Sequence, residues 1–204
     1  MATATRPRLL TAERFQEWAN RPENDSARWE LVEGQVVKTP SPGEAHALVC
    51  WFVSQVLSGY LASRGSGHLL TNDCGLIVAR SPDTVRGPGI MLSLEDLSLE
   101  DASPGHSTRL PTLVVEVYSP NDRPGNMARR VEQFLRRGVP LVWVVYPEER
   151  TVSVYRHDEL PKVLDETDEL VGNGVLPGFL CQVADLFKLP SKKTARRPRK
   201  GNRE

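Results

Sequence analysis

The segment 112–118, with the sequence TLVVEVY, constrains the fold more than any other part of this chain. A near-continuous apolar run of this length indicates a β-strand that is buried on both faces, because a half-exposed strand would alternate apolar and polar residues. Such a strand needs neighbouring strands at its edges and helices over its faces. We therefore predict an α/β fold of the α+β type, with a central mixed β-sheet flanked by helices.

Two longer segments have the apolar spacing of the helices that such a sheet needs. In the range 41–64, Ser41 is the expected N-cap, Pro42 the first helical residue, and Glu44 follows three residues after the serine. This helix has an apolar stripe that consists of Val49, Phe52, Val53, Val56, Leu57, Tyr60 and Leu61. A second helix is predicted at 126–137, ended by Gly138.

Further elements are predicted on both sides of the buried strand, because short apolar runs alternate with turn residues. The first is a hairpin at 29–38, WELVEGQVVK, which turns at Glu33 and Gly34. The others are a short helix at 11–20 with Thr11 as its N-cap, a strand pair at 68–80 and 84–92, a surface loop at 95–108, strands at 141–145 and 151–156, a short strand near Val163 and a closing helix at 183–188.

The length of 204 residues favours one domain, which we place at 11–190 between an N-terminal extension, 1–10, and a disordered basic tail, 191–204. The tail has seven Lys and Arg residues and one Glu, so it carries +6 and the rest of the chain carries −6. It is either an arm that binds phosphates without sequence preference or a solvated terminus. The acidic body argues against a surface that grips DNA, because such surfaces are usually basic.

Composition narrows the class of protein further. No apolar run approaches the roughly 20 residues that span a bilayer, and the first ten residues have no apolar region of a signal peptide. The cysteines Cys50, Cys74 and Cys181 are far apart and form no CxxC pair, so we expect free thiols rather than disulfides or a zinc cluster. We therefore expect a cytoplasmic protein without a membrane segment.

Glu116 is the residue of the buried strand that needs an explanation. It follows three apolar residues and precedes Val117, where an ionised carboxylate is costly unless a cation compensates it. One interpretation is a metal ligand, and the other is a structural ion pair with an arginine. The residues around Glu116 leave both open.

The chain resembles a known family in an ordered series of motifs. These are WELVEGQVV, SPGEAHALV, VVEVYSPND, EQFLRRGVPLVWVVYP, VSVYR and LPGF, which together cover 9–189. In this order and spacing they are similar to the Uma-type restriction endonucleases, a branch of the PD-(D/E)XK nuclease superfamily. The resemblance implies a restriction-endonuclease-like core that binds Mg²⁺ and hydrolyses DNA, where the metal polarises a phosphate and lowers the pKa of the attacking water.

The resemblance also assigns candidate catalytic residues. Glu116 corresponds to the strand carboxylate and metal ligand, Glu30 to the glutamate of the first hairpin, and His46 to the helix histidine. His46 would orient a water or contact a phosphate, or it is a hydrogen-bonded packing residue, because a lone imidazole needs partners. Glu30 alternates with Trp29 and Leu31, so it could also be a solvated strand residue.

Five positions depart from the family pattern. Gly89 occupies the position of the metal-binding aspartate, and Arg130 occupies that of the lysine that stabilises developing negative charge. The other three are Asn126 for an acid, Phe134 for a tyrosine and Tyr146 for an aspartate. Glycine offers no ligand, and the planar fork of arginine differs from the compact ammonium of lysine.

These departures give three hypotheses for the function. The first is a nuclease-fold protein in which DNA hydrolysis is lost or much reduced and which has become a binding or assembly module. The second is an active Mg²⁺-dependent endonuclease in which Asp73 or Asp83 replaces the missing ligand. The third is a protein–protein interaction domain. DNA and a second copy of the chain are the candidate partners, and we expect Arg130 to reach Glu116 from the helix that follows the strand.

Overall fold

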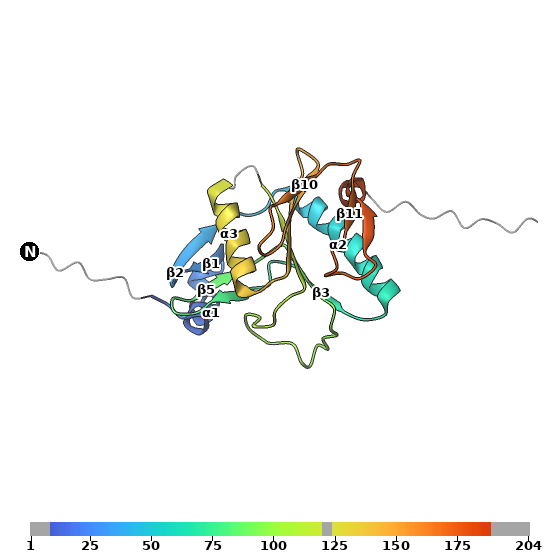
Figure 1. Ribbon diagram of the computed structural model, residues 1–204. Helices are drawn as coiled ribbons and strands as arrows, with labels where there is room; N and C mark the ends of the chain where they lie inside the picture. The colour runs from blue at the N-terminus through green and yellow to red at the C-terminus, as the bar shows by residue number, and fades with distance from the viewer. Residues whose placement is uncertain (1–8, 120–123, 189–204) are drawn as a thin grey trace, which may run out of the picture.

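The computed structural model describes residues 9–119 and 124–188. Most of the predicted N-terminal extension and the whole basic tail at 191–204 lie outside the described residues. The described part contains two main β-sheets, three α-helices and a small hairpin near its C-terminal end (Figure 1).

The larger sheet has six strands in the order β10-β9-β8-β7-β6-β3. β7 pairs in parallel with β8 and antiparallel with β6, so the sheet is mixed, as predicted. All five residues of β7 are buried, which confirms that the apolar run forms a strand buried on both faces. The strands are β3 (His68–Leu70), β6 (Ile90–Ser93), β7 (Leu113–Val117), β8 (Leu141–Tyr146), β9 (Thr151–Tyr155) and β10 (Lys162–Leu164).

Two helices, α2 (Glu44–Arg64) and α3 (Pro124–Arg137), cover opposite faces of this sheet (Figure 1). Side chains alternate along a strand, so Leu113 and Val115 of β7 belong to the apolar cluster of α2. Val114, between them, belongs to the cluster of α3. The two layers of core that the buried strand required are therefore both present.

A smaller sheet of four strands, in the order β2-β1-β5-β4, lies on the α3 side of the molecule (Figure 1). It consists of β1 (Arg28–Val32), β2 (Gln35–Thr39), β4 (Leu76–Ala79) and β5 (Thr84–Arg86). The helix α1 (Ala12–Ala19) packs against it through Phe15, and the 3-10 turn η1 (Pro22–Asn24) leads into β1. The hairpin predicted from WELVEGQVVK is confirmed as the β1–β2 pair.

The start of α2 differs from the prediction. Gly43, and not Ser41, is the N-cap, and no side chain caps the helix. Gly43 has the extended backbone that an N-cap needs, and its carbonyl accepts the first helical hydrogen bond from Ala47.

The predicted strand pair at 68–80 and 84–92 is only partly correct. β4 and β5 do form a hairpin around the turn at 80–83, but β3 and β6, at the outer ends of the two ranges, pair with each other in the larger sheet. The non-strand residues 71–75 and 87–89 separate the two halves. Each predicted strand is therefore two strands that belong to different sheets.

Two elements near the C-terminal end of the described part were not predicted correctly. β11 (Glu169–Val171) and β12 (Leu180–Gln182) form a two-stranded antiparallel hairpin that no sequence pattern indicated. The expected closing helix is a 3-10 segment, η2 (Val183–Phe187). It packs on α2 through Val183 and Leu186.

Candidate functional site

Glu116 lies on the face of the larger sheet that α3 covers. It follows Val115 on β7, so the alternation of side chains turns it away from the α2 core and toward α3. Only 5% of the residue is exposed. Because a buried carboxylate needs a compensating cation, the neighbours of Glu116 determine the chemistry of this site.

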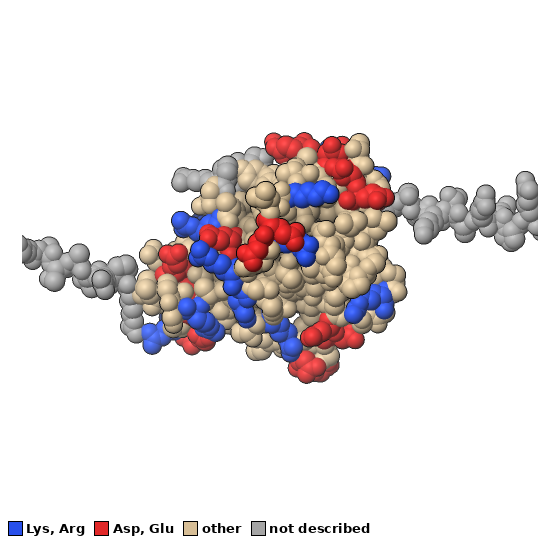
Figure 2. Space-filling view, viewed as in Figure 1, with Lys and Arg blue, Asp and Glu red and all other residues tan. Residues whose placement is uncertain are grey.

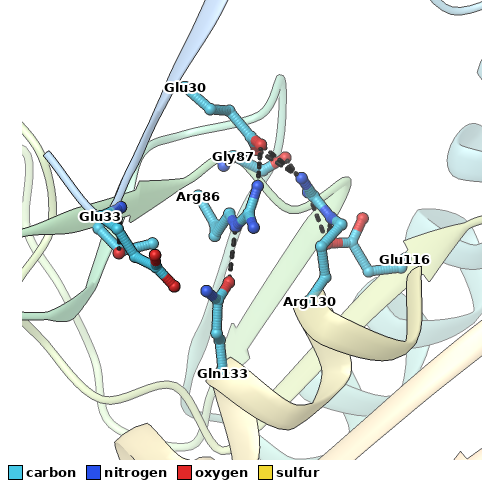
Figure 3. Close-up of polar contacts among 8 residues, drawn as sticks. Glu30, Glu33, Arg86, Gly87, Glu116, Arg130 and Gln133 are labelled. Atoms are coloured by element: carbon cyan, nitrogen blue, oxygen red, sulfur yellow. Dashed lines mark hydrogen bonds and ion pairs between the residues drawn. The ribbon is translucent and has the colours of Figure 1, made fainter. Parts of the chain in front are cut away.

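The cation beside Glu116 is Arg130 of α3, as the sequence analysis expected (Figure 3). Its Nε and Nη2 atoms donate hydrogen bonds to Oε1 of Glu116, with donor–acceptor distances of 2.9 and 2.7 Å. Nη2 also donates to the Gly87 carbonyl at 3.2 Å. Both bonds to Glu116 thus converge on one carboxylate oxygen, and each is strengthened by the charges of its donor and acceptor.

Glu30 of β1 is bound by the same guanidinium. Nη1 of Arg130 lies 2.6 Å from Oε1 and 2.7 Å from Oε2 of Glu30. Glu30 is 6% exposed, so the alternative of a solvated strand residue is wrong. Its oxygens also accept bonds from Nη1 of Arg86 and from the backbone N–H of Gly87, both at 2.8 Å.

Arg86, Glu30, Arg130 and Glu116 therefore form a continuous ion cluster between the two sheets (Figure 3). It contains two guanidinium groups and two carboxylates, so its formal charge is balanced. Gln133, one turn beyond Arg130 on α3, accepts a bond from Nε of Arg86 at 2.8 Å. We call these four charged residues the ion cluster.

The two carboxylates of the ion cluster have opposite pKa shifts. Burial disfavours the charged form of Glu30, but the charges of Arg130 and Arg86 outweigh it and hold its pKa below the usual value. Burial raises the pKa of Glu116; the charge of Arg130 opposes the rise and that of Glu30 adds to it. Although burial disfavours its charge, the two carboxylates raise the pKa of Arg130, so it stays charged.

Gly89 lies directly before β6, next to the β7 end that contains Glu116, because Ile90 is opposite Val115. A Cβ atom at this position would lie 3.4 Å from Sγ of Cys50 and 3.4 Å from the Val115 carbonyl, which is ordinary contact. Its φ is outside the left-handed region that favours glycine. The fold therefore does not require a glycine at position 89, because there is room for the Cβ atom of a larger residue.

His46 and Cys50 lie one turn apart on α2, with 3.6 Å between Nδ1 and Sγ. Burial, followed by the charge of Glu116, raises the pKa of Cys50 to about 11, so its thiol is protonated at neutral pH. His46 lines a pocket of about 320 Å³ together with Glu30, Glu116 and Arg130. The structure thus brings all four candidate catalytic residues to one pocket.

The two aspartates that could replace the missing ligand differ in position. Asp83 accepts bonds from Arg80 and from the backbone N–H groups of Ala12 and Ser81, so it holds the start of α1. Asp73 lines the pocket of the ion cluster and forms an ion pair with Arg28. Only Asp73 therefore faces the space that a rearranged ligand would need.

The residues present do not fit a Mg²⁺ ion. This cation requires oxygen ligands in near-octahedral geometry, but both oxygens of Glu30 already accept two bonds each from arginine and backbone donors. Position 89 has no ligand atom in its side chain. Within 9–119 and 124–188, no group of three or more His, Cys, Asp or Glu residues is arranged to hold a metal ion.

Arg86 and Gln133 were not predicted from the sequence. Arg86 is 7% exposed at the end of β5, in the sequence TVRGPG. A charged residue in a predicted strand could have indicated a buried ion pair there, as Glu116 did in its own strand. Of the other family departures, Asn126 lines the pocket, Phe134 is buried in the core of α3, and the ring of Tyr146 lies 5.2 Å from that of Tyr118.

Comparisons with known proteins agree with this architecture. The sequence profile of the family Uma2, described as "Putative restriction endonuclease", matches residues 12–184. The structure is similar to the crystal structure of a "putative nuclease belonging to DUF820" from Anabaena variabilis ATCC 29413, with a TM-score of 0.72. The two sequences are 18% identical, and the match covers 87% of this chain and 97% of that chain. At this identity the likeness concerns the fold. No curated protein matches the sequence.

Proposed function

Because the chain belongs to the Uma2 family of restriction-endonuclease-like proteins, we propose that it is a nuclease-fold binding module in which Arg130 replaces the metal ion. DNA hydrolysis is then lost or much reduced. The observation that carries this proposal is the position of the Arg130 guanidinium, which donates to both Glu116 and Glu30.

The chemistry of a guanidinium differs from that of a metal ion in the step that matters for hydrolysis. A bound Mg²⁺ polarises the phosphate and lowers the pKa of a water that it coordinates. Arg130 supplies positive charge, but it coordinates no water and does not act as a base, because the neighbouring carboxylates raise its pKa further. The ion cluster can therefore position a group in the pocket without activating a nucleophile.

The formal charge of −6 on the chain outside the tail favours limited contact between the folded domain and DNA. On the face shown in Figure 2, a row of Lys and Arg side chains crosses the left half of the molecule, with Asp and Glu side chains beside it. The tail at 191–204, with seven basic residues, is the part of the sequence best suited to contact phosphates. We assign DNA contact to this tail and positioning of a bound group to the pocket.

The test is the nicking of a supercoiled plasmid with and without Mg²⁺. The wild-type protein should not nick, whereas Gly89→Asp combined with Arg130→Lys restores the carboxylate and the compact cation of the family and should nick only with Mg²⁺. The matched control is Gly89→Asn with Arg130→Lys, which has the same shape without the second carboxylate.

The opposite result would support an active endonuclease with a rearranged ligand set. The position of Asp73 in the pocket favours this second candidate. If wild-type protein nicks plasmid with Mg²⁺ and both Glu116→Gln and Asp73→Asn abolish nicking, the proposal that Arg130 replaces the metal ion is wrong. The Asp73 variant is informative because this residue contacts Arg28 and not the ion cluster.

A further inference from the structure

The outward face of α2 is apolar and uncharged although it is exposed. The inward stripe of the helix, formed by Val49, Val53, Leu57 and Leu61, is buried in the core. Between Glu44 and Arg64 the helix has no Lys, Arg, Asp or Glu. On the outward side Leu48 is 47% exposed and Trp51 is 45% exposed. A surface helix normally has charged residues on this side, so the face is suited to contact another apolar surface.

Gly59 gives a second, independent indication of a partner. It lies inside α2 and is exposed, and a Cβ atom added to it would meet nothing within 4 Å. Glycine destabilises a helix interior relative to alanine, so nothing within the described residues explains its presence. Close approach of another helix backbone would explain it, because a side chain at this position would hold the two helices apart.

The outward residues follow the spacing of a helix-pairing seam. Counted from Gln55, they lie three, four and seven residues away in both directions, which is the repeat of a left-handed helix pair. Large side chains occupy the N-terminal half of the seam, and small ones occupy the C-terminal half. The seam consists of Leu48, Trp51, Phe52, Gln55, Ser58, Gly59 and Ala62.

We propose that a second copy of this chain packs on the seam, with the two α2 helices antiparallel about a two-fold axis at Gln55. This arrangement places every large residue against a small one: Trp51 faces Gly59 of the partner subunit, and Phe52 faces Ser58 of the partner subunit. Leu48 in the same way faces Ala62 of the partner subunit. The surface is thus complementary to itself, as a two-fold interface requires, and the two Gln55 amides meet at the axis.

A membrane is the other candidate partner for an apolar helix. α2 is long and apolar enough to cross a bilayer by length and composition, with 22% of the relevant window buried. However, its inward stripe packs against β6 and β7, so the helix cannot span a membrane while the domain is folded. A membrane surface would also give no reason for the match between large and small residues on either side of Gln55.

The dimer has a consequence for the candidate site, although it does not depend on the proposed function. His46 lies nine residues before Gln55 on α2, so the two histidines would be about 27 Å apart along the paired helices. The dimer thus presents two pockets at opposite ends of the interface. The ion cluster belongs to the opposite face of the larger sheet, so changes at the seam should leave it intact.

The oligomeric state of the full chain and of Gln55 variants tests the proposal. Sedimentation velocity over a range of protein concentrations should show a dimer for the wild type. Gln55→Glu and Gln55→Lys each place like charges at the axis and should weaken dimerisation by roughly tenfold or more. An equimolar mixture of the two should restore the dimer as a heterodimer. Gln35→Glu and Gln35→Lys are matched controls on β2, where the side chain is exposed, and should change nothing.

A second variant distinguishes the seam from other interfaces. Gly59→Arg meets no atom of its own chain near Cβ and should keep the circular dichroism spectrum and thermal unfolding of a folded protein, yet be monomeric. A wild-type protein that is monomeric at all concentrations would overturn the proposal. So would a dimer that Gly59→Arg and both Gln55 variants leave unchanged, or a monomer that cosediments with phosphatidylcholine vesicles through this face.

Discussion

Arg130 is the residue on which the interpretation of this site depends, since one guanidinium binds both buried carboxylates. Removing its charge leaves Glu30 and Glu116 facing each other without a compensating cation between them. We expect Arg130→Met to destabilise the protein by about 3–5 kcal/mol at pH 7.5, the usual cost of breaking a buried ion pair from one side.

The loss should depend on pH in a defined direction. Without Arg130 the pKa of at least one of the two carboxyls rises above its unfolded value, because like charges disfavour ionisation. The folded state then binds more protons than the unfolded state between those two pKa values, so the stability of the variant falls as pH rises through that window. Chemical denaturation of the variant should show a smaller deficit relative to wild type at pH 5 than at pH 7.5.

Arg136→Met is the control for this experiment. Arg136 lies on the same helix and pairs with Glu132, but both side chains are exposed. Its removal should change stability by less than about 1 kcal/mol at either pH. Equal effects of the two substitutions would mean that the ion cluster is not a strong structural element.

The two carboxylates should differ when each is neutralised singly. The pKa of Glu30 is lowered, so its ionised form stabilises the fold above its unfolded pKa, and that stabilisation is lost as pH falls through the folded pKa. The pKa of Glu116 is raised, so its ionised form costs stability at neutral pH. Glu30→Gln should therefore destabilise by about 1.5–3 kcal/mol, and Glu116→Gln by clearly less. Urea denaturation at pH 7.5 would measure both, and a larger loss for Glu116→Gln would contradict the assignment.

The sequence predicted part of this cluster and not the rest. Glu116 was identified because it interrupts an apolar run, and Arg130 because it follows at a distance that the family motif fixes. Glu30 was a candidate only through the family motif, since the hairpin pattern also fits a solvated strand residue and does not reveal that β1 lies against the α3 face. Arg86 is a charged residue in a strand, but local sequence could not indicate its partners, which are 56 and 47 residues away in the chain.

At the scale of elements, α1 depends on a residue that is distant in sequence. The predicted N-cap Thr11 accepts a long bond of 3.4 Å from Arg14, whereas Asp83 accepts a 2.8 Å bond from the first helical N–H, that of Ala12. Asp83→Ala should therefore cost about 1–2 kcal/mol, in the range of a lost helix cap, and Thr11→Ala less.

Hydrogen exchange would measure this difference directly. The Ala12 amide should lose protection in Asp83→Ala and keep most of it in Thr11→Ala. Asp83 has a lowered pKa: burial disfavours its charge, but bonds from Ala12, Ser81 and Arg80 outweigh it. The protection should thus also decline as pH falls through the folded pKa of this carboxyl. Equal loss in both variants would restore Thr11 as the main cap.

Pairing partners were the part of the elements that local sequence could not supply. Apolar runs located β4, β5 and β6 correctly, but the predicted turn at 81–83 suggested one long hairpin in place of strands in two sheets. A run of residues specifies a strand through burial, and its partner depends on contacts that are distant in the chain. The β11–β12 hairpin was missed for a different reason: most of its residues are exposed, so neither strand has an apolar run.

For the whole molecule, the family resemblance predicted the architecture, and the structure confirms it. The motif series covers nearly all of the described chain, and the mixed sheet between α2 and α3 follows from it. Gly89 and Arg130 lie between these motifs, at positions where the chain departs from the family pattern in the expected ligand and in the expected lysine. A fold depends on many apolar positions, whereas a metal site depends on a few side chains.

The tail at 191–204 gives a prediction about the whole chain, because its charge of +6 is opposite to that of the rest of the chain. Deleting it leaves a body with a formal charge of −6. Any DNA affinity should then fall, and the logarithmic salt dependence should flatten by about 0.9 for each phosphate contact that is lost. Relative affinity for different DNA sequences should stay unchanged, because phosphate contacts carry no direct sequence information.

A tail of the same length made of Ser, Gly and Asn is the control, since it keeps the chain length and removes only the charge. Fluorescence anisotropy with labelled duplexes at several salt concentrations would measure affinity and slope together. The neutral tail should behave as the deletion does if charge alone is responsible. If both variants bind DNA as wild type does, the phosphate contacts belong to the folded domain, and the pocket that contains Arg28, His46 and Asn126 becomes the surface to mutate next.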